Sequence, residues 1–435
     1  MTTTKIAAAL SVGIAAFAAV LPVSSPAQAA ASTLHVSTKG ADSNPGTATR
    51  PLRSIQRAVD LAAAGTQILV HAGSYAGKVT ITRSGTAAAP VSLAPAGDGA
   101  VTLTSRPATT SCGASKPATE RTLMFMNGVD HWTVRGMAIT GGVTIVGAKS
   151  NSAYNYMQNF VESRNWQARR AVPGRGSHDP VAARNALAYI SQRTGVTINP
   201  ADGIALLDNT ITRRGVYVAT GRYGRIKGNR ITDIDCGTGP AIWLQTLSDG
   251  WTVAGNQISD VARSTYKHFM QEGVRLGMAS NYNTVEDNVV ADILGDGRAF
   301  NTDVDASWNT FRGNTARNVA MGYNDQKSGW GNHWLRNRSE GARVYGFAFR
   351  IADGVLARPS MDTSTHKTVV SCNRATGSGT HLYVGGAKQS TFTGNAFSTV
   401  GISKNARAYW GREGNRYNGS ATAPAPKPPM NLAGC

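Results

Sequence analysis

Cationic side chains and a histidine recur in the central part of the sequence in a pattern suited to proton abstraction. Lys267 and His268 shortly precede Arg275, and Lys327 and Arg350 follow it. A cation can neutralise the carboxylate of a uronic acid, and a lysine or histidine can then remove the proton on the neighbouring carbon. These five residues are our candidates for the catalytic groups of a β-elimination.

Closely spaced aspartates form a second candidate group. Asp296, Asp303 and Asp305 fall within one repeat of the sequence, and Asp325 follows in the next. Carboxylate oxygens are ligands that calcium prefers, so the four predict a calcium site. The alternative is hydrolysis, because Asp303 with Asp325 or Glu272 could supply the two carboxyl groups of a glycosidase.

Seven short segments alternate apolar with polar or aromatic side chains, as strands do: GVYVAT, AIWLQT, GVRLGM, AFNTDVD, GYNDQKS, YGFAFRI and HLYVGG. Since side chains alternate along a strand, burial of Val274 and Leu276 would place Arg275 on the outer face. Aromatic and amide side chains at matching outward positions could bind sugar rings and hydroxyls: Tyr217, Trp243, Gln245, Asn301, Asn324 and Tyr383. An ordinary solvated sheet face is the alternative interpretation.

The strands need a scaffold, and a repeated phrase predicts it. An apolar alternation, an asparagine and a second alternation recur around Asn209, Asn229, Asn256, Asn288, Asn314, Asn337, Asn373 and Asn395, at spacings of 20 to 36 residues. Such a period is typical of a solenoid, and short alternating segments indicate a β-solenoid. Asparagine tolerates left-handed turns, and stacked amides could bond to each other along one corner.

The segment HVSTKGADSNPGTATRPLRSIQRAVDLAAAGTQILVHAGSYAGKVTI, from His35 to Ile81, resembles the N-terminal segment of many secreted β-helix proteins, including family 9 pectate lyases. With the asparagine turns, the resemblance to the pectate-lyase-like superfamily covers most of the chain. It implies an all-β, right-handed parallel β-helix. The strand that carries the catalytic lysine in family 9 has Asn301 and Thr302 here. Asn301-Thr302-Asp303 is similar to a motif of family 28 polygalacturonases, whose other motifs are missing at the matching places.

The ends of the chain predict a leader, a cap and a tail. Lys5, the apolar run 6–20 and Ala27-Gln28-Ala29 are typical of a signal peptide, so we assign 1–30 to it and expect secretion. Residues 31–418 would form the β-helix, with 419–435 as a Pro-rich tail. Leu52, Ile55, Val59 and Ala62 predict a helix that covers the first coil. Residues 150–200 predict a long inserted loop with a helix from Pro180 to Gln192.

The cysteine content and the net charge indicate which disulfides and which partners to expect. Cys112, Cys236, Cys372 and Cys435 suggest two disulfides with three possible pairings. The chain has 44 Lys and Arg against 25 Asp and Glu, a net charge of +19. In a secreted protein this favours an acidic polysaccharide partner, and we expect no nucleic-acid partner, no membrane span and a monomer.

The function that these features predict is a secreted polysaccharide lyase. A glycoside hydrolase of the same fold is the second hypothesis. A C5-epimerase shares the proton abstraction, and a non-catalytic β-helix that binds carbohydrate or cell wall belongs to a different class. All remain open from the sequence.

Overall fold

The protein divides into two compact units, Met1–Ala30 and Ala31–Cys435. The computed structural model describes residues 32–105, 121–147, 192, 195, 197–234, 239–261, 271–293, 295–303, 305–326, 329–350, 364–377, 379–430 and 435. The predicted signal peptide and inserted helix lie outside these residues, except for Gln192. None of the helices in the described part has the length and apolarity needed to cross a bilayer.

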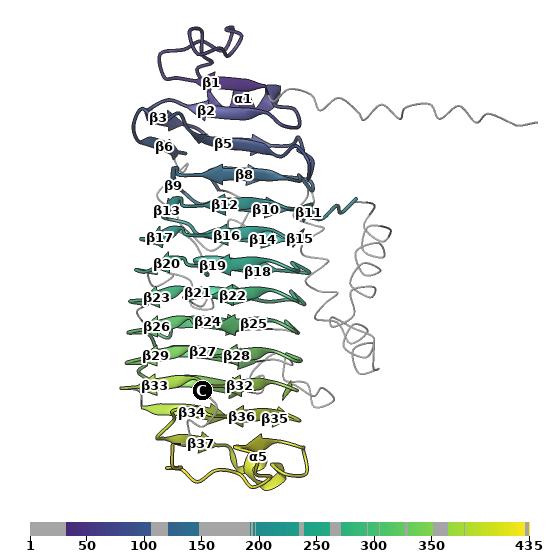
Figure 1. Ribbon diagram of the computed structural model, residues 1–435, viewed down its shortest axis with the longest axis vertical. Coiled ribbons are helices and arrows are strands. Elements are labelled where there is room, and N and C mark those ends of the chain that lie inside the picture. The colour runs from purple at the N-terminus through teal and green to yellow at the C-terminus, as the bar shows by residue number, and fades with distance from the viewer. Residues whose placement is uncertain are drawn as a thin grey trace, which may run out of the picture. The chain divides into compact units, whose positions relative to one another are not determined.

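Three long parallel sheets, which we call A, B and C, make up the second unit (Figure 1). Sheet A contains, in order, β1 (Thr33–Val36), β2 (Gln67–Val70), β5 (Val91–Pro95), β8 (Trp132–Arg135), β12 (Ala205–Leu207), β16 (Arg225–Lys227), β19 (Thr252–Ala254), β22 (Thr284–Glu286), β25 (Thr310–Arg312), β28 (His333–Leu335), β32 (Val369–Ser371), β36 (Thr391–Thr393) and β38 (Arg416–Tyr417).

Sheet B contains β3 (Gly73–Ala76), β6 (Val101–Thr104), β9 (Ala138–Thr140), β13 (Thr210–Thr212), β17 (Arg230–Thr232), β20 (Gln257–Ile258), β23 (Val289–Ala291), β26 (Thr315–Arg317), β29 (Arg338–Glu340) and β33 (Arg374–Thr376). Two short sheets pair β11 (Ala201–Asp202) with β15 (Gly221–Arg222) and β31 (Thr365–His366) with β35 (Ala387–Lys388).

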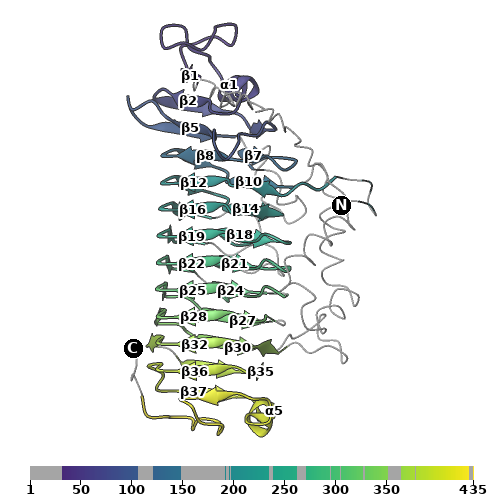
Figure 2. The ribbon, with the colours of Figure 1, turned by 45° about the vertical axis from the view of Figure 1, so that its right-hand side comes forward.

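Sheet C contains β4 (Val79–Ile81), β7 (Leu123–Phe125), β10 (Val143–Val146), β14 (Val216–Ala219), β18 (Ile242–Gln245), β21 (Glu272–Leu276), β24 (Arg298–Thr302), β27 (Met321–Gln326), β30 (Tyr345–Arg350), β34 (Thr380–Val384) and β37 (Val400–Ile402). The chain passes from sheet C to A to B in each rung, as β14, β16 and β17 do before β18 starts the next rung. Figure 2 shows strands of A beside strands of C at successive levels.

The interior of the coil is apolar and stacked. Phe300, Tyr323 and Phe347 lie on adjacent strands of sheet C, with ring centroids 5.0 and 4.5 Å apart and nearly parallel planes. In sheet A, Phe311 stacks on Trp334 at 4.1 Å. Because each rung repeats the same inward positions, like side chains pile up along the axis and bury each other's faces.

The asparagine corner forms the ladder that the repeat predicts. From Asn209 to Asn395, each side-chain amide donates to the side-chain oxygen of the asparagine in the next rung, at 2.9 to 3.1 Å. Each of these oxygens also accepts from the backbone N–H of the preceding ladder asparagine, as Asn229 does from Asn209. All eight residues are buried.

The two ends of the stack differ from the predictions in detail. The N-terminal helix is α1 (Ile55–Leu61), which packs beside β4 and buries Ile55 and Val59. It is shorter than predicted, since Leu52 forms a bridge with Val36 instead. At the other end lies α5 (Lys404–Tyr409) (Figure 1).

The C-terminal tail is packed on the last rungs. The N–H of Val400 donates to the carbonyl of Pro426 at 2.8 Å. A disulfide joins Cys372 to Cys435 and ties the end of the chain to the asparagine corner. Cys112 and Cys236 lie outside the described residues.

Candidate functional site

The outer face of sheet C carries the predicted row of side chains. Backbone pairing aligns Tyr217, Trp243, Arg275, Asn301, Asn324, Ala348 and Tyr383 on consecutive strands. Rungs are about 4.8 Å apart, so the row is a continuous strip along the axis. The register predicted from alternation is therefore confirmed.

Arg275 is the centre of this strip. Its guanidinium donates to Glu272 Oε2 at 3.1 Å and to Asp303 Oδ2. Its Cζ lies 5.4 Å from the centre of the Trp243 ring, in a cation–π contact. Only 11% of the side chain is exposed. Arg275 therefore holds two carboxylates and an indole in fixed positions.

Glu272 reaches the outer face because β21 departs from strict alternation. A Cβ added to Gly273 would meet Val290 of the core at 2.5 Å, so Gly273 and Val274 both turn inward. Glu272 and Arg275 then lie on the same side of the strand. Glycine is required at 273 because the backbone packs directly against the interior.

Amide side chains extend the network to the next two rungs. Asn301 Nδ2 donates to Glu272 Oε1 at 2.7 Å, and Asn324 Nδ2 donates to Asn301 Oδ1 at 2.5 Å. Arg298 Nη1 lies 3.6 Å from Glu272 Oε1. Burial lowers the pKa of Arg298, although Glu272 opposes that shift. Glu272, fully buried, thus has neighbours from its own strand β21 and from β24.

A second outward row contains Gln245, Gly277, Asp303, Gln326 and Arg350. Arg350 Nη2 donates to Gln326 Oε1 at 2.9 Å. A Cβ on Gly277 would lie 3.2 Å from Gln245 Oε1 and 3.6 Å from Arg275 Nε. The bare backbone at this position makes room for the Arg275 side chain to cross toward Asp303.

Tyr217 supports the strip from one side. Its ring meets Trp243 edge-on at 5.3 Å, and Arg121 Cζ lies 6.0 Å from its centre. Burial raises the pKa of Tyr217 to about 12 and lowers that of Arg121 to about 9. At the other end Tyr383 stacks on Tyr345 at 4.8 Å.

Several polar atoms of the strip are buried without a hydrogen-bond partner. Among the described residues these include Trp243 Nε1, Gln245 Oε1, Asn324 Oδ1, Arg298 Nε and Arg350 Nε. Buried polar atoms are normally satisfied, so a concentration of exceptions on one face requires an explanation. A polar ligand bound along the strip would provide the missing partners.

Asp325 corrects one prediction. It lies on β27 beside Asn324 but points into the coil, where it is fully buried. Its Oδ1 accepts from Thr302 Oγ1 at 2.8 Å, and Asn332 and Trp334 lie within 3.3 Å. Because Asp303 faces outward and Asp325 inward, the structure does not bring the two together.

Replacing Asp325 with asparagine should remove a pH-dependent loss of stability. Burial raises the pKa of Asp325 to about 6, from 3.8. The favourable contribution of the neutral carboxyl is complete below about pH 4 and is lost as pH rises through about 6. That loss is about 3 kcal/mol.

The test measures the free energy of unfolding in urea from pH 4 to 8. Asp325→Asn should show a flatter dependence of this free energy on pH and unchanged activity, with exposed Asp60→Asn as the control. Parallel profiles for wild type and Asp325→Asn would contradict this.

The predicted calcium ligands do not converge. Asp296 is exposed before β24, whereas Asp303 and Asp305 follow that strand, whose length of about 16 Å separates them. No group of three or more His, Cys, Asp or Glu side chains suited to a metal occurs in the described ranges. Three predicted catalytic residues, Lys267, His268 and Lys327, lie outside those ranges.

Arg298 was not among the predicted site residues, and no partner was predicted for Tyr217. Arg298 pairs with Glu272 at the same offset of 26 residues that links Arg275 to Asn301, so the register carried a usable signal. Arg121 had no such signal, because it precedes the repeated phrase and approaches from an earlier rung.

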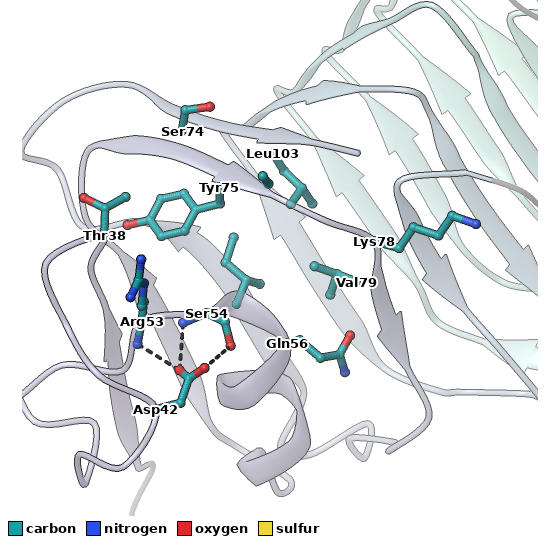
Figure 3. A pocket seen from close by; sticks show the side chains of 12 residues that line it. Thr38, Asp42, Arg53, Ser54, Gln56, Ser74, Tyr75, Lys78, Val79 and Leu103 are labelled. Atoms are coloured by element: carbon teal, nitrogen blue, oxygen red, sulfur yellow. Dashed lines mark hydrogen bonds between the residues drawn. The ribbon is translucent and has the colours of Figure 1, made fainter. Parts of the chain in front are cut away.

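A separate pocket of about 440 Å³ lies at the N-terminal end, between α1 and β3 (Figure 3). Asp42 accepts hydrogen bonds there from the Arg53 and Ser54 backbone at 3.0 and 2.8 Å. Tyr75 donates to the carbonyl of His71 at 2.7 Å. The Asp42 bonds hold its loop to the start of α1, and the residues that line the pocket are not part of the strip.

The family models that match this chain agree with its β-helix fold. Residues 175–337 match the family model described as "Right handed beta helix region". The chain contains a right-handed β-helix region. A second model, "Protein of unknown function (DUF1565)", matches residues 38–82 at the start of the β-helix. No curated protein sequence matches the chain.

Solved structures share the β-helix. A rhamnogalacturonan lyase is 13% identical with a TM-score of 0.53, over 84% of this chain and 87% of that chain. A glycoside hydrolase is 12% identical with a TM-score of 0.48, over 89% and 96%. A pectate lyase is 10% identical with a TM-score of 0.44, over 86% and 78%. At 13% identity, the similarity to the rhamnogalacturonan lyase shows the fold alone.

Proposed function

We propose that this β-helix is a secreted enzyme that binds an acidic polysaccharide along the outer face of sheet C and cleaves it by β-elimination. The observation that carries the proposal is the strip itself. It combines partly exposed aromatic rings, ordered amides and buried polar atoms that have no partner among the described residues. Sugars offer both hydroxyls for such atoms and faces for such rings.

The charge of the cluster supports an acidic substrate. Among the described residues, the guanidinium groups of Arg275 and Arg298 lie against the carboxylates of Glu272 and Asp303, and that of Arg350 donates to Gln326. These three cations and two anions carry one excess positive charge. A uronate carboxylate would balance it, and a bound guanidinium would stabilise the negative charge that develops when the adjacent proton leaves.

Lys267 and His268 are the proposed bases, because they stand in the segment that leads directly into β21. Lys327 follows β27 and is the alternative. The base removes the proton alpha to the carboxylate, and expulsion of the 4-linked sugar oxygen completes the double bond.

Hydrolysis is the second candidate, favoured by one observation. Glu272 and Asp303 lie on the same face and share Arg275, so two carboxylates are held together. One could protonate the leaving oxygen while the other activates water or attacks the sugar.

The experiment that decides is a product assay on a polymer panel. Purified protein is incubated with polygalacturonate, rhamnogalacturonan, alginate, xylan and neutral β-glucan, with calcium or with chelator. Elimination generates an unsaturated uronate that absorbs in the ultraviolet, and we expect this signal on an acidic polymer. New reducing ends without that absorbance would support hydrolysis, and neither product on any polymer would contradict an enzymatic role.

A further inference from the structure

The corner between sheets C and A carries a second regular feature. One residue per rung donates its N–H to a carbonyl in the next rung, at 2.6 to 3.2 Å. In seven consecutive rungs these positions are His131, Gly203, Tyr223, Gly250, Tyr282, Trp308 and Gly331. Figure 1 labels β11 and β15, which lie in this corner beside β12 and β16.

Rings and glycines are matched along this corner. A Cβ on Gly250 would lie 2.7 Å from the Tyr223 ring, and a Cβ on Gly331 would lie 2.2 Å from the Trp308 ring. The rings of Tyr223 and Trp308 therefore each lie over a glycine of the following rung, whereas Tyr282 is followed by Trp308. A side chain at the glycine would lift the ring from the surface.

The aromatic residues take a backbone conformation that glycine would adopt more easily. Tyr223, Tyr282 and Trp308 have φ of 54°, 57° and 58°. Bulky residues in this left-handed region are uncommon and strained. Since glycine occupies three of the seven rungs, the fold itself does not require rings at these positions.

The rings are also accessible. Tyr223 is 67% and Tyr282 41% exposed, and Arg222 Cζ lies 5.8 Å from the Tyr223 ring. Tyr223 and Tyr282 are two rungs apart, about 9 to 10 Å. This spacing is comparable with the length of two linked sugar rings, and exposed aromatic faces are suited to stack on such rings.

We propose that this corner, defined by His131, Tyr223, Tyr282 and Trp308, is a second, non-catalytic binding surface for a linear polysaccharide that runs along the β-helix axis. The inference goes beyond the proposed function and rests on it only for the class of ligand. The surface would hold a long polymer on the enzyme independently of turnover at the strip.

The test uses glycine substitutions, which the left-handed backbone favours. Tyr223→Gly and Tyr282→Gly are combined in the full chain, and mobility is measured in native gels containing each polymer of the panel. The double variant should bind the retarding polymer at least tenfold more weakly while its melting temperature stays equal or rises. Turnover of a short oligosaccharide should not change.

A matched control removes an exposed aromatic elsewhere. Tyr409 of α5 is 49% exposed and has Arg412 over its ring, as Tyr223 has Arg222. Tyr409→Ala should leave retardation intact. The proposal is overturned if wild type is retarded by no polymer, if the double variant is retarded equally, or if Tyr409→Ala weakens binding as much. The Arg275→Met variant, which lacks the proposed catalytic cation, should still be retarded by the polymer. Retained retardation with lost turnover would distinguish this binding surface from the proposed catalytic site.

Discussion

Replacing Arg275 with methionine should reduce turnover of the cleaved polymer by roughly 10²- to 10³-fold. The substitution removes the cation that binds Glu272 and Asp303 and that lies over Trp243. Initial rates over a range of polymer concentrations would show whether kcat falls more than KM rises. A fall mainly in kcat is expected, because the charge stabilises the developing negative charge.

Removing one member of a buried ion cluster can also destabilise the fold, by about 3 to 5 kcal/mol. Arg275→Lys is therefore the companion variant, since it keeps the charge but loses the two-pronged contact. The matched control is Arg312→Met, which breaks an exposed pair with Glu286 on sheet A. Full activity in a folded Arg275→Met protein would exclude Arg275 from the reaction.

Replacing Asn288 with alanine should lower the free energy of unfolding by about 3 to 5 kcal/mol. Asn288 is fully buried and makes four hydrogen bonds with its side chain, to Asn256, Asn314 and the carbonyl of Val253. The truncation leaves the buried Asn256 backbone N–H without its acceptor and removes one hydrogen bond each from the Asn256 amide and the Val253 carbonyl. Urea denaturation followed by circular dichroism measures the loss.

The control is Gln257→Ala, which deletes an exposed amide one residue beyond Asn256. Surface changes of this kind usually stay within about 0.5 kcal/mol. If Asn288→Ala proved no more destabilising than Gln257→Ala, the ladder would be dispensable for stability.

The solenoid could be predicted because its physical requirements repeat. Each rung needs a corner amide that bonds to the next rung and inward positions that are apolar, so Asn229 and Asn256 or Val274 and Phe300 return in order. The left-handed residue of the turn is the one before the asparagine, such as Gly228 or Gly255, and not the asparagine as predicted. Periodicity then fixes the register, and the register fixes the outward row from Tyr217 to Tyr383. Helix α1 is shorter than predicted because Leu52 forms a β-bridge with Val36 instead of joining the helix.

The chemistry was less predictable, because side-chain direction decides it. Asp325 and Asp303 look alike in the sequence, yet one lies in the core and the other on the face. Glu272 faces outward only because Gly273 allows a break in alternation. The aromatic corner was also missed, since Tyr223 and Tyr282 stand in turns where strand alternation gives no direction.

The most direct test of the strip as substrate site is a crystal structure of Arg275→Met with an oligosaccharide of the best-cleaved polymer. If no polymer is cleaved, oligogalacturonate with the wild-type protein is used. We predict a chain along sheet C that stacks on Trp243 and bonds to Gln245 and Asn324, which supplies partners to their buried atoms. An oligosaccharide bound only away from sheet C would contradict the assignment of this face.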